Sequence, residues 1–293
     1  MTTRALYTWM ALTGKYAPII NAESWGLTDI FATYPVNVTT HIPYMQSYLE
    51  TMREHNPHLK IHLWALWSRS PLDNSIMSPT NTEHKSLIMN NIEEIISECD
   101  FDGVTMDDPI VISTYYKPVK DDPVKVQALS DSLTSFISDF VDTVHSVDNI
   151  PVSGNTPRYN APNSQADGLM NVREINECFD YITVGLTTYL SREASNGYDF
   201  VKEEYKKYIE SGNHLGKKII VEMLSFDRYT SKLKTHQELN KELKLLLNLN
   251  PEGYAVCFYD KFSPGYVFPQ SFRESVVYQR RNVVDRRRRT NIL

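Results

Sequence analysis

Short apolar runs alternate with amphipathic stretches along most of this chain. The apolar runs are bounded by Gly, Pro, Asn or Asp, which is typical of buried strands, whereas apolar residues recurring every three or four positions indicate helices packed on a sheet. The expected strands are 5–12, 27–34, 59–67, 101–109, 150–155, 181–187, 218–224 and 253–259. The expected helices are 44–55, 81–98, 123–147, 172–178, 198–211, 235–249 and 272–279.

Strands separated by helical segments in this order predict an α/β fold, a single (β/α)8 TIM barrel spanning residues 1–279. The length of 293 residues fits one large barrel as well as two smaller domains, but no break in composition marks a linker. The helix expected between the first two strands has a weak pattern. A doubly wound open sheet is therefore the alternative architecture.

Charge is distributed unevenly along the chain. The net charge is −6, yet residues 280–293 hold six arginines against one aspartate, a balance of +5 that leaves −11 for the rest. An acidic body does not resemble a nucleic-acid-binding fold, so we expect no nucleic-acid partner. We expect the basic tail to be a solvated, disordered end, with contact to an anionic partner as the alternative.

No apolar stretch is long enough to span a membrane, and the chain enters a strand pattern without a secretory signal. We expect a protein of the cytoplasm or of a larger particle, unless a signal has been removed. Cys99, Cys178 and Cys257 lack zinc-ligand spacing and are expected to be small buried residues, a Cys nucleophile being the alternative. The histidines show no ligand spacing and no Gly-rich phosphate loop is present, so neither metal nor cofactor is expected.

The fourth expected strand, Phe-Asp-Gly-Val-Thr-Met-Asp-Asp-Pro, ends in two adjacent carboxylates. Side chains alternate along a strand, which puts Thr105 and Asp107 on one face. Because the carboxyl ends of barrel strands line the active site, we expect Asp107 to point into the barrel mouth and Asp108 to begin the loop. The alternative is that the two acids only cap a turn or the next helix.

Glu222 interrupts an otherwise apolar seventh strand, Ile-Ile-Val-Glu-Met. A buried carboxylate is costly unless it is paired or functional, and its structural alternative is a salt bridge to Arg228 or to a lysine lining the barrel. Glycoside cleavage uses two carboxyl groups, of which one protonates the leaving oxygen and the other attacks or activates water. We predict Asp107 as nucleophile or acid, Glu222 as its partner, and Asp108 as a neighbour that positions Asp107 or adjusts its pKa.

Other residues at expected strand ends are aromatic or polar. Flat aromatic side chains suit the apolar ring faces of sugars, so we predict a polysaccharide or oligosaccharide substrate. The predicted substrate-binding residues are Trp9, Tyr34, Trp67, Arg69, Asn155, Arg158, Tyr189, Tyr259 and Asp260. Of these, Asn155, Arg158 and Tyr189 are expected to hydrogen-bond to substrate hydroxyls or to the departing oxygen.

The segment Phe101 to Asp108 resembles the fourth-strand signature of the family 18 chitinases and of related glycoside-hydrolase-like barrels. Residues 179–184, Phe-Asp-Tyr-Ile-Thr-Val, are similar to their sixth strand and are followed by Tyr189, where those proteins usually place an active-site tyrosine. Residues 216–220 resemble their seventh-strand entry. The resemblance implies a polysaccharide-active barrel, and the Asp-Asp ending is closer to the glycoside-hydrolase-like barrels, in which a fourth-strand Asp is the catalytic acid or nucleophile.

The chain departs from the chitinase pattern at three positions. Pro109 stands where chitinases carry their acid, Thr105 replaces the middle Asp of the motif, and Leu190 replaces the Asp after the sixth-strand tyrosine. These departures argue against substrate-assisted chitinase chemistry. Two hypotheses follow: a glycoside hydrolase acting on a cell-wall or surface polysaccharide, and a non-catalytic barrel that binds glycan or forms a structural module.

Overall fold

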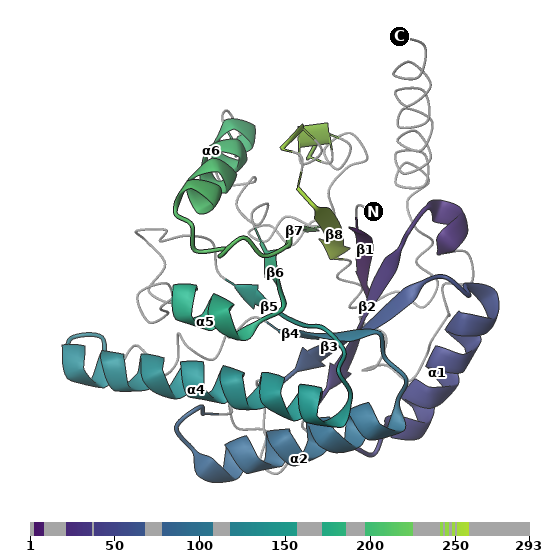
Figure 1. Ribbon diagram of the computed structural model, residues 1–293, viewed down its shortest axis with the longest axis horizontal. Helices are drawn as coiled ribbons and strands as arrows, with labels where there is room; N and C mark the ends of the chain where they lie inside the picture. Colours follow the sequence, from purple (N-terminus) through teal and green to yellow (C-terminus); the bar gives the residue numbers. More distant parts are fainter. Residues whose placement is uncertain are drawn as a thin grey trace.

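Parallel strands pair in sequence order and β8 pairs with β1, which closes the sheet into a barrel (Figure 1). The computed structural model describes residues 3–8, 22–36, 38–67, 78–107, 118–156, 172–185, 197–224 and 241–257, except 243, 246–247 and 250. The predicted single (β/α)8 barrel is confirmed, and the open-sheet alternative is wrong because an open sheet has no pairing between its first and last strands.

The strands are β1 Thr3–Thr8, β2 Asp29–Pro35, β3 Lys60–Leu66, β4 Gly103–Met106, β5 Val152–Thr156, β6 Tyr181–Val184, β7 Ile219–Leu224 and β8 Gly253–Cys257. The helices are α1 Ile42–His55, α2 Thr82–Glu98, α4 Pro123–Val147, α5 Val172–Cys178 and α6 Gly197–Glu210, with a 3-10 turn η1 at Glu23–Trp25. Of the expected helix 235–249, the described positions 241, 242, 244, 245 and 248 are helical. The expected helix 272–279 and the basic tail lie outside the described residues.

Local sequence sets where the long helices begin. The side chain of Asn81 accepts hydrogen bonds from the backbone N–H groups of Glu83 and His84, which caps α2. Asp122 caps α4 in the same way, and Pro123 follows at the first helical position, where its missing N–H costs nothing. Both helices then bury apolar residues spaced three or four apart, and they lie side by side on the outside of the barrel (Figure 1).

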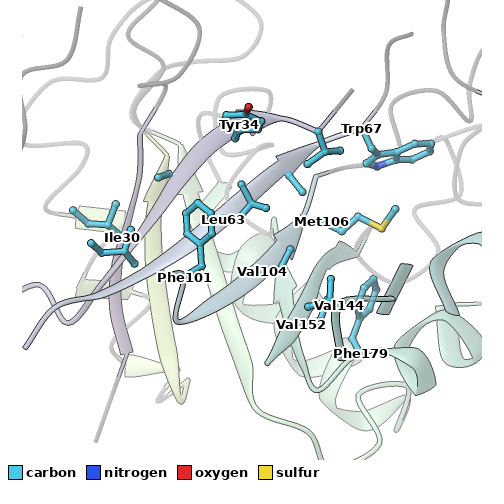
Figure 2. Packing of buried hydrophobic residues seen from close by; sticks show 14 of the residues in the cluster. Ile30, Tyr34, Leu63, Trp67, Phe101, Val104, Met106, Val144, Val152 and Phe179 are labelled. Carbon is cyan, nitrogen blue, oxygen red and sulfur yellow. The ribbon is translucent and has the colours of Figure 1, made fainter. Parts of the chain in front are cut away.

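Alternation along each strand produces two cores. One face packs outward against the helices, and Figure 2 shows part of this cluster, including Ile30, Leu63, Val104 and Val152. The other face fills the barrel. Its apolar members are Ala5, Tyr7, Phe31, Trp64, Tyr181, Ile220 and Ala255. Alternate positions along a strand therefore place side chains in the outer core against the helices or in the barrel interior.

A repeated side-chain cap closes the N-terminal end of the barrel. The residue just before each even-numbered strand accepts a hydrogen bond from a backbone N–H near the start of the preceding odd-numbered strand. The bonds are Arg4 N to Thr28 Oγ1 at 2.8 Å, Ile61 N to Asp102 Oδ2 at 2.8 Å, Val152 N to Asp180 Oδ2 at 2.7 Å and Ile219 N to Glu252 Oε2 at 3.0 Å. Each side-chain oxygen thus takes the place of a backbone carbonyl that the neighbouring strand would supply, because the backbone pairing of the two strands has not yet begun there.

Candidate active site

Asp107 follows β4 directly, and three of its atoms bind β3 or the residue just after β3. Its backbone N–H donates to the carbonyl of Ala65 at 3.0 Å, and its own carbonyl accepts from Nε1 of Trp67 at 3.1 Å. Its carboxylate Oδ1 accepts from Nε1 of Trp64 at 2.8 Å. The side chain is partly buried. Since Thr105 two residues earlier lies inside the barrel, Asp107 faces the interior at the C-terminal end of the strand.

Trp64 is held inside the barrel by aromatic neighbours. Its ring makes an edge contact with Tyr7 at a centroid distance of 4.8 Å, and Tyr7 stacks on Phe31 at 4.6 Å. Only 6% of Trp64 is exposed. The indole N–H is therefore directed at Asp107 by a packed wall of rings.

Glu222 lies on β7, two residues beyond the inward-facing Ile220, and is 7% exposed. Burial, followed by the charge of Glu222, raises the pKa of Tyr7 well above its ordinary value. The phenol of Tyr7 therefore stays protonated beside this carboxyl group. Arg228, the alternative salt-bridge partner of Glu222, lies outside the described residues.

The strand registers place the two carboxyl groups at adjacent levels of the barrel. Alternate strands contribute side chains to one layer in this fold. A level here is the height of a residue along the barrel axis. The strand pairings around the barrel give the same height to Tyr7, Trp64, Glu222 and strand position 155. Asp107 lies one level further toward the C-terminal ends. Residues from strands four and seven thus approach the same end of the barrel.

A network of polar side chains lies beneath these levels. Asp29 Oδ1 is 2.9 Å from Nε2 of His62, whose Nδ1 is 3.4 Å from the hydroxyl of Tyr181. Thr105 continues the network, with its Oγ1 at 3.4 Å from Tyr181 and 2.8 Å from Ser153 Oγ. Although burial raises the pKa of Asp29, the hydrogen bond and charge of His62 outweigh it, and the pKa is lowered.

The sequence-based interpretation did not include this polar network. Its signal is present in the third strand, where His62 and Trp64 alternate with apolar residues, but their partners lie on other strands. Gly103 is required here, because a Cβ at this position would lie 2.4 Å from Nδ1 of His62. The glycine of the Asp-Gly pair therefore makes room for a buried histidine.

Tyr34 and Trp67 are buried in the outer core and do not form a solvent-facing wall for a sugar. Both side chains belong to the cluster between the strands and the helices, with 0% and 1% exposure (Figure 2). Trp67 packs on Phe136 of α4 at a centroid distance of 4.8 Å. The physical reason is alternation: Tyr34 follows the inward position of Thr33, so its ring points to the helices.

The other predicted site residues fall where the structure gives no description of their side chains. Trp9, Arg69, Asp108, Arg158, Tyr189, Tyr259 and Asp260 lie outside the described residues. Asn155 pairs with Thr183 through the backbone of β5, and its side chain is not described. These residues remain predictions.

Within the described ranges, no three His, Cys, Asp or Glu side chains are arranged to hold a metal ion. Across the same part of the chain, no helix combines the length and apolar character needed to cross a membrane.

Neither a protein-family model nor a curated protein matches this sequence. The structure is similar to the PgaB (BpsB) glycoside hydrolase domain from Bordetella bronchiseptica, with a TM-score of 0.64 and 13% identity over 93% of this chain and 95% of that one. It is also similar to a chitinase from Chromobacterium violaceum, with a TM-score of 0.62 and 11% identity over 94% and 98%. The spore cortex-lytic enzyme SleL from Bacillus megaterium matches with a TM-score of 0.58 and 11% identity over 94% and 73%.

These similarities show that the chain shares the barrel fold of this chitinase and of the PgaB and SleL structures. At such low identities the likeness concerns the fold alone.

Proposed function

We propose that this protein is a glycoside hydrolase that cleaves O-glycosidic bonds in a cell-wall or surface polysaccharide. Asp107 and Glu222 are the two carboxyl groups that such a reaction needs. The observation that carries the proposal is their placement, at adjacent levels inside the C-terminal end of the barrel. Enzymes with this fold carry their active sites at that end.

The neighbours in fold support a glycan as the substrate. They include chitinases and a spore cortex-lytic enzyme, and a tobacco class V chitinase has been determined in complex with NAG4. In the proposed site, Asn155 lies in β5 at the level of Glu222. Arg158 follows β5 in the sequence, and Tyr189 follows β6. We assign these three residues to hydrogen bonds with substrate hydroxyls, and Asp108 to a supporting role beside Asp107.

The chemistry is an acid-assisted displacement at the anomeric carbon. One carboxyl group gives its proton to the glycosidic oxygen, which takes the bonding pair as the C–O bond breaks. The other group, as a carboxylate, either bonds to the anomeric carbon or removes a proton from the attacking water. A separation of about 5 Å between the two groups leads to retention of configuration, and one of about 6.5 to 9.5 Å leads to inversion.

The test is the release of reducing ends from a panel of cell-wall and surface polysaccharides. The wild type is expected to cleave at least one glycan, and Asp107→Asn and Glu222→Gln are each expected to cleave it at least about 100-fold more slowly. Asp102→Asn is the matched control, because it makes the same change at the opposite end of β4. If Asp107→Asn cleaves the glycan as fast as the wild type, the assignment of Asp107 fails.

The second candidate is a non-catalytic barrel that binds glycan or forms a structural module. Pro109 favours it, because this residue stands where the chitinase motif carries its acid. Under this alternative, calorimetry detects oligosaccharide binding, but no glycan in the panel yields new reducing ends. Release of reducing ends that depends on Asp107 excludes it.

A further inference from the structure

We infer that Trp64 is a positioning residue that holds Asp107 as the ionised member of the carboxyl pair, leaving Glu222 as the proton donor. The assignment of these two roles rests on the proposed glycosidase function. The contact between Trp64 and Asp107 does not, and it can be tested without any substrate.

Two tryptophans hold Asp107 from different sides. Trp64 lies on the inner face of β3 and binds the carboxylate, whereas Trp67, just after β3, lies in the outer core and binds the backbone carbonyl. Together with the bond from Asp107 N to Ala65 O, these contacts immobilise both the backbone and the side chain. The two tryptophans therefore have different roles, since Trp67 holds the backbone of Asp107 and Trp64 holds its reactive group.

The indole N–H of Trp64 favours the ionised form of the Asp107 carboxyl group. An indole N–H can donate but never accept, so its partner must offer a lone pair. A bond to an ionised carboxylate is stronger than a bond to a neutral carboxyl group, because the charge assists it. The 2.8 Å contact from Trp64 thus stabilises the charged form of Asp107 more than its neutral form.

The indole of Trp64 has little freedom to move. Trp64 is packed edge-on against Tyr7, which is itself stacked on Phe31. The indole cannot turn away from Asp107 without displacing these rings. A donor that is already oriented contributes more to holding a charge than one that must be ordered during the reaction.

Glu222 has a different environment. It is 7% exposed, one level deeper than the partly exposed Asp107, and the protonated phenol of Tyr7 lies beside it. Removal from water disfavours the charged form of a carboxyl group. A phenol hydroxyl can accept a hydrogen bond as well as donate one, so Tyr7 can bind a protonated Glu222, whereas the indole of Trp64 can only donate to Asp107. The described titratable side chains at these two levels are Tyr7, Asp107 and Glu222. Of the two acids, Asp107 therefore has the more favourable setting for a negative charge.

Glu222 transfers its proton to the glycosidic oxygen as the C–O bond breaks, and the departing sugar leaves as an alcohol. In the retaining case Asp107 bonds to the anomeric carbon and is later displaced by water, which returns a proton to Glu222. In the inverting case the attacking water gives its proton to Asp107, and solvent then removes this proton and reprotonates Glu222. Either route consumes one water.

The test is an NMR titration of the full-length protein carrying 13C-labelled aspartate. Trp64→Phe keeps a ring in the same space but removes the indole N–H, so the titration midpoint of the Asp107 carboxyl group is expected to move to higher pH. Trp67→Phe is the matched control: it removes the other indole N–H, which binds only the backbone carbonyl, and is expected to leave the midpoint unchanged. An unchanged midpoint in folded Trp64→Phe overturns the inference.

A measurement on the wild type covers the case in which Trp64→Phe does not fold. The Nε1–H resonance of Trp64 in a 15N spectrum is expected to shift with the same midpoint as the Asp107 carboxyl carbon. A Trp64 resonance that does not respond at this midpoint also overturns the inference. A shifted midpoint without cleavage of any glycan leaves the Trp64 contact valid and refutes the proposed function. Cleavage that requires Asp107, with an unshifted midpoint, supports the proposed function and refutes the role of Trp64.

Discussion

Nε1 of Trp64 donates a 2.8 Å hydrogen bond across the β3–β4 pairing to Oδ1 of Asp107. This bond joins the barrel interior to the point where β4 ends, and Glu222 lies at the level of Trp64 on the far strand β7. A set of packed rings therefore lies at the level just below the proposed catalytic base or nucleophile. We expect substitutions at this end of the barrel to change activity and substitutions at the opposite end to change stability.

The reaction rates of the Glu222 and Asp107 variants are expected to depend differently on the leaving group of the substrate. In an activated aryl glycoside of the sugar identified by the panel, the aryl leaving group departs without protonation. Glu222→Gln is therefore expected to recover most of its lost rate on this substrate. Asp107→Asn is expected to remain slow on both substrates, because the attack itself is impaired. The measurement is the ratio of rates on activated and natural substrates. If Asp107→Asn recovers and Glu222→Gln does not, the two roles are reversed.

Asp102 is expected to contribute to stability rather than chemistry. Its carboxylate accepts from Ile61 N and pairs with Arg53 at the N-terminal end of the barrel. Asp102→Asn is expected to lower the free energy of unfolding by about 1 to 3 kcal/mol, because a partly buried charge-assisted bond is lost. Urea denaturation measures this change. The control is Asp100→Asn, whose side chain is 84% exposed in its pair with Arg53 and whose removal is expected to cost less than about 1 kcal/mol.

A methyl group at Gly103 is expected to cost less stability when His62 is removed. Gly103→Ala places a Cβ against His62 Nδ1, and such overpacking costs about 1 to 3 kcal/mol. A double-mutant cycle with His62→Ala, followed by urea denaturation, measures the coupling. The cost of Gly103→Ala is expected to fall in the His62→Ala background. Equal costs in both backgrounds would show that the steric conflict lies elsewhere, for example with the carbonyl of Pro151 at 2.9 Å.

Protonation of Asp29 at low pH is expected to lower the stability of the barrel. Burial raises the pKa of Asp29 in the folded state, but the hydrogen bond and charge of His62 outweigh burial and hold this pKa below its ordinary value of 3.8. The stability from this group is therefore present above the unfolded pKa and is lost as the pH falls through the folded pKa.

Asp29→Asn is expected to flatten the pH dependence of the unfolding free energy below about pH 5. Urea midpoints measured across this range test the prediction. Asp139→Asn serves as the control, because Asp139 forms a surface pair with Lys85 and its substitution is expected to keep the wild-type dependence. A wild-type slope in Asp29→Asn contradicts the role assigned to Asp29.

The sequence motifs contained two functions that only the structure separates. In the stretch that resembles the chitinase signature, Asp102 caps β3 at one end of the barrel and Asp107 faces the interior at the other. Asp180 in the sixth-strand motif repeats the role of Asp102, since it accepts from Val152 N. These two motif aspartates therefore support the starts of parallel strands, because each supplies an acceptor to a backbone N–H where the strand pairing has not yet begun.

The sequence by itself determined the order of strands and helices and the shared face of Thr105 and Asp107, because both follow from local periodicity. It did not determine that Tyr34 and Trp67 belong to the outer core, or that Trp64 binds Asp107. Those facts depend on strand register and barrel closure, which relate residues distant in the chain. Tertiary structure alone decided which strands bring their acids to a common level, because the stagger accumulated around the closed sheet sets the height of every inward side chain.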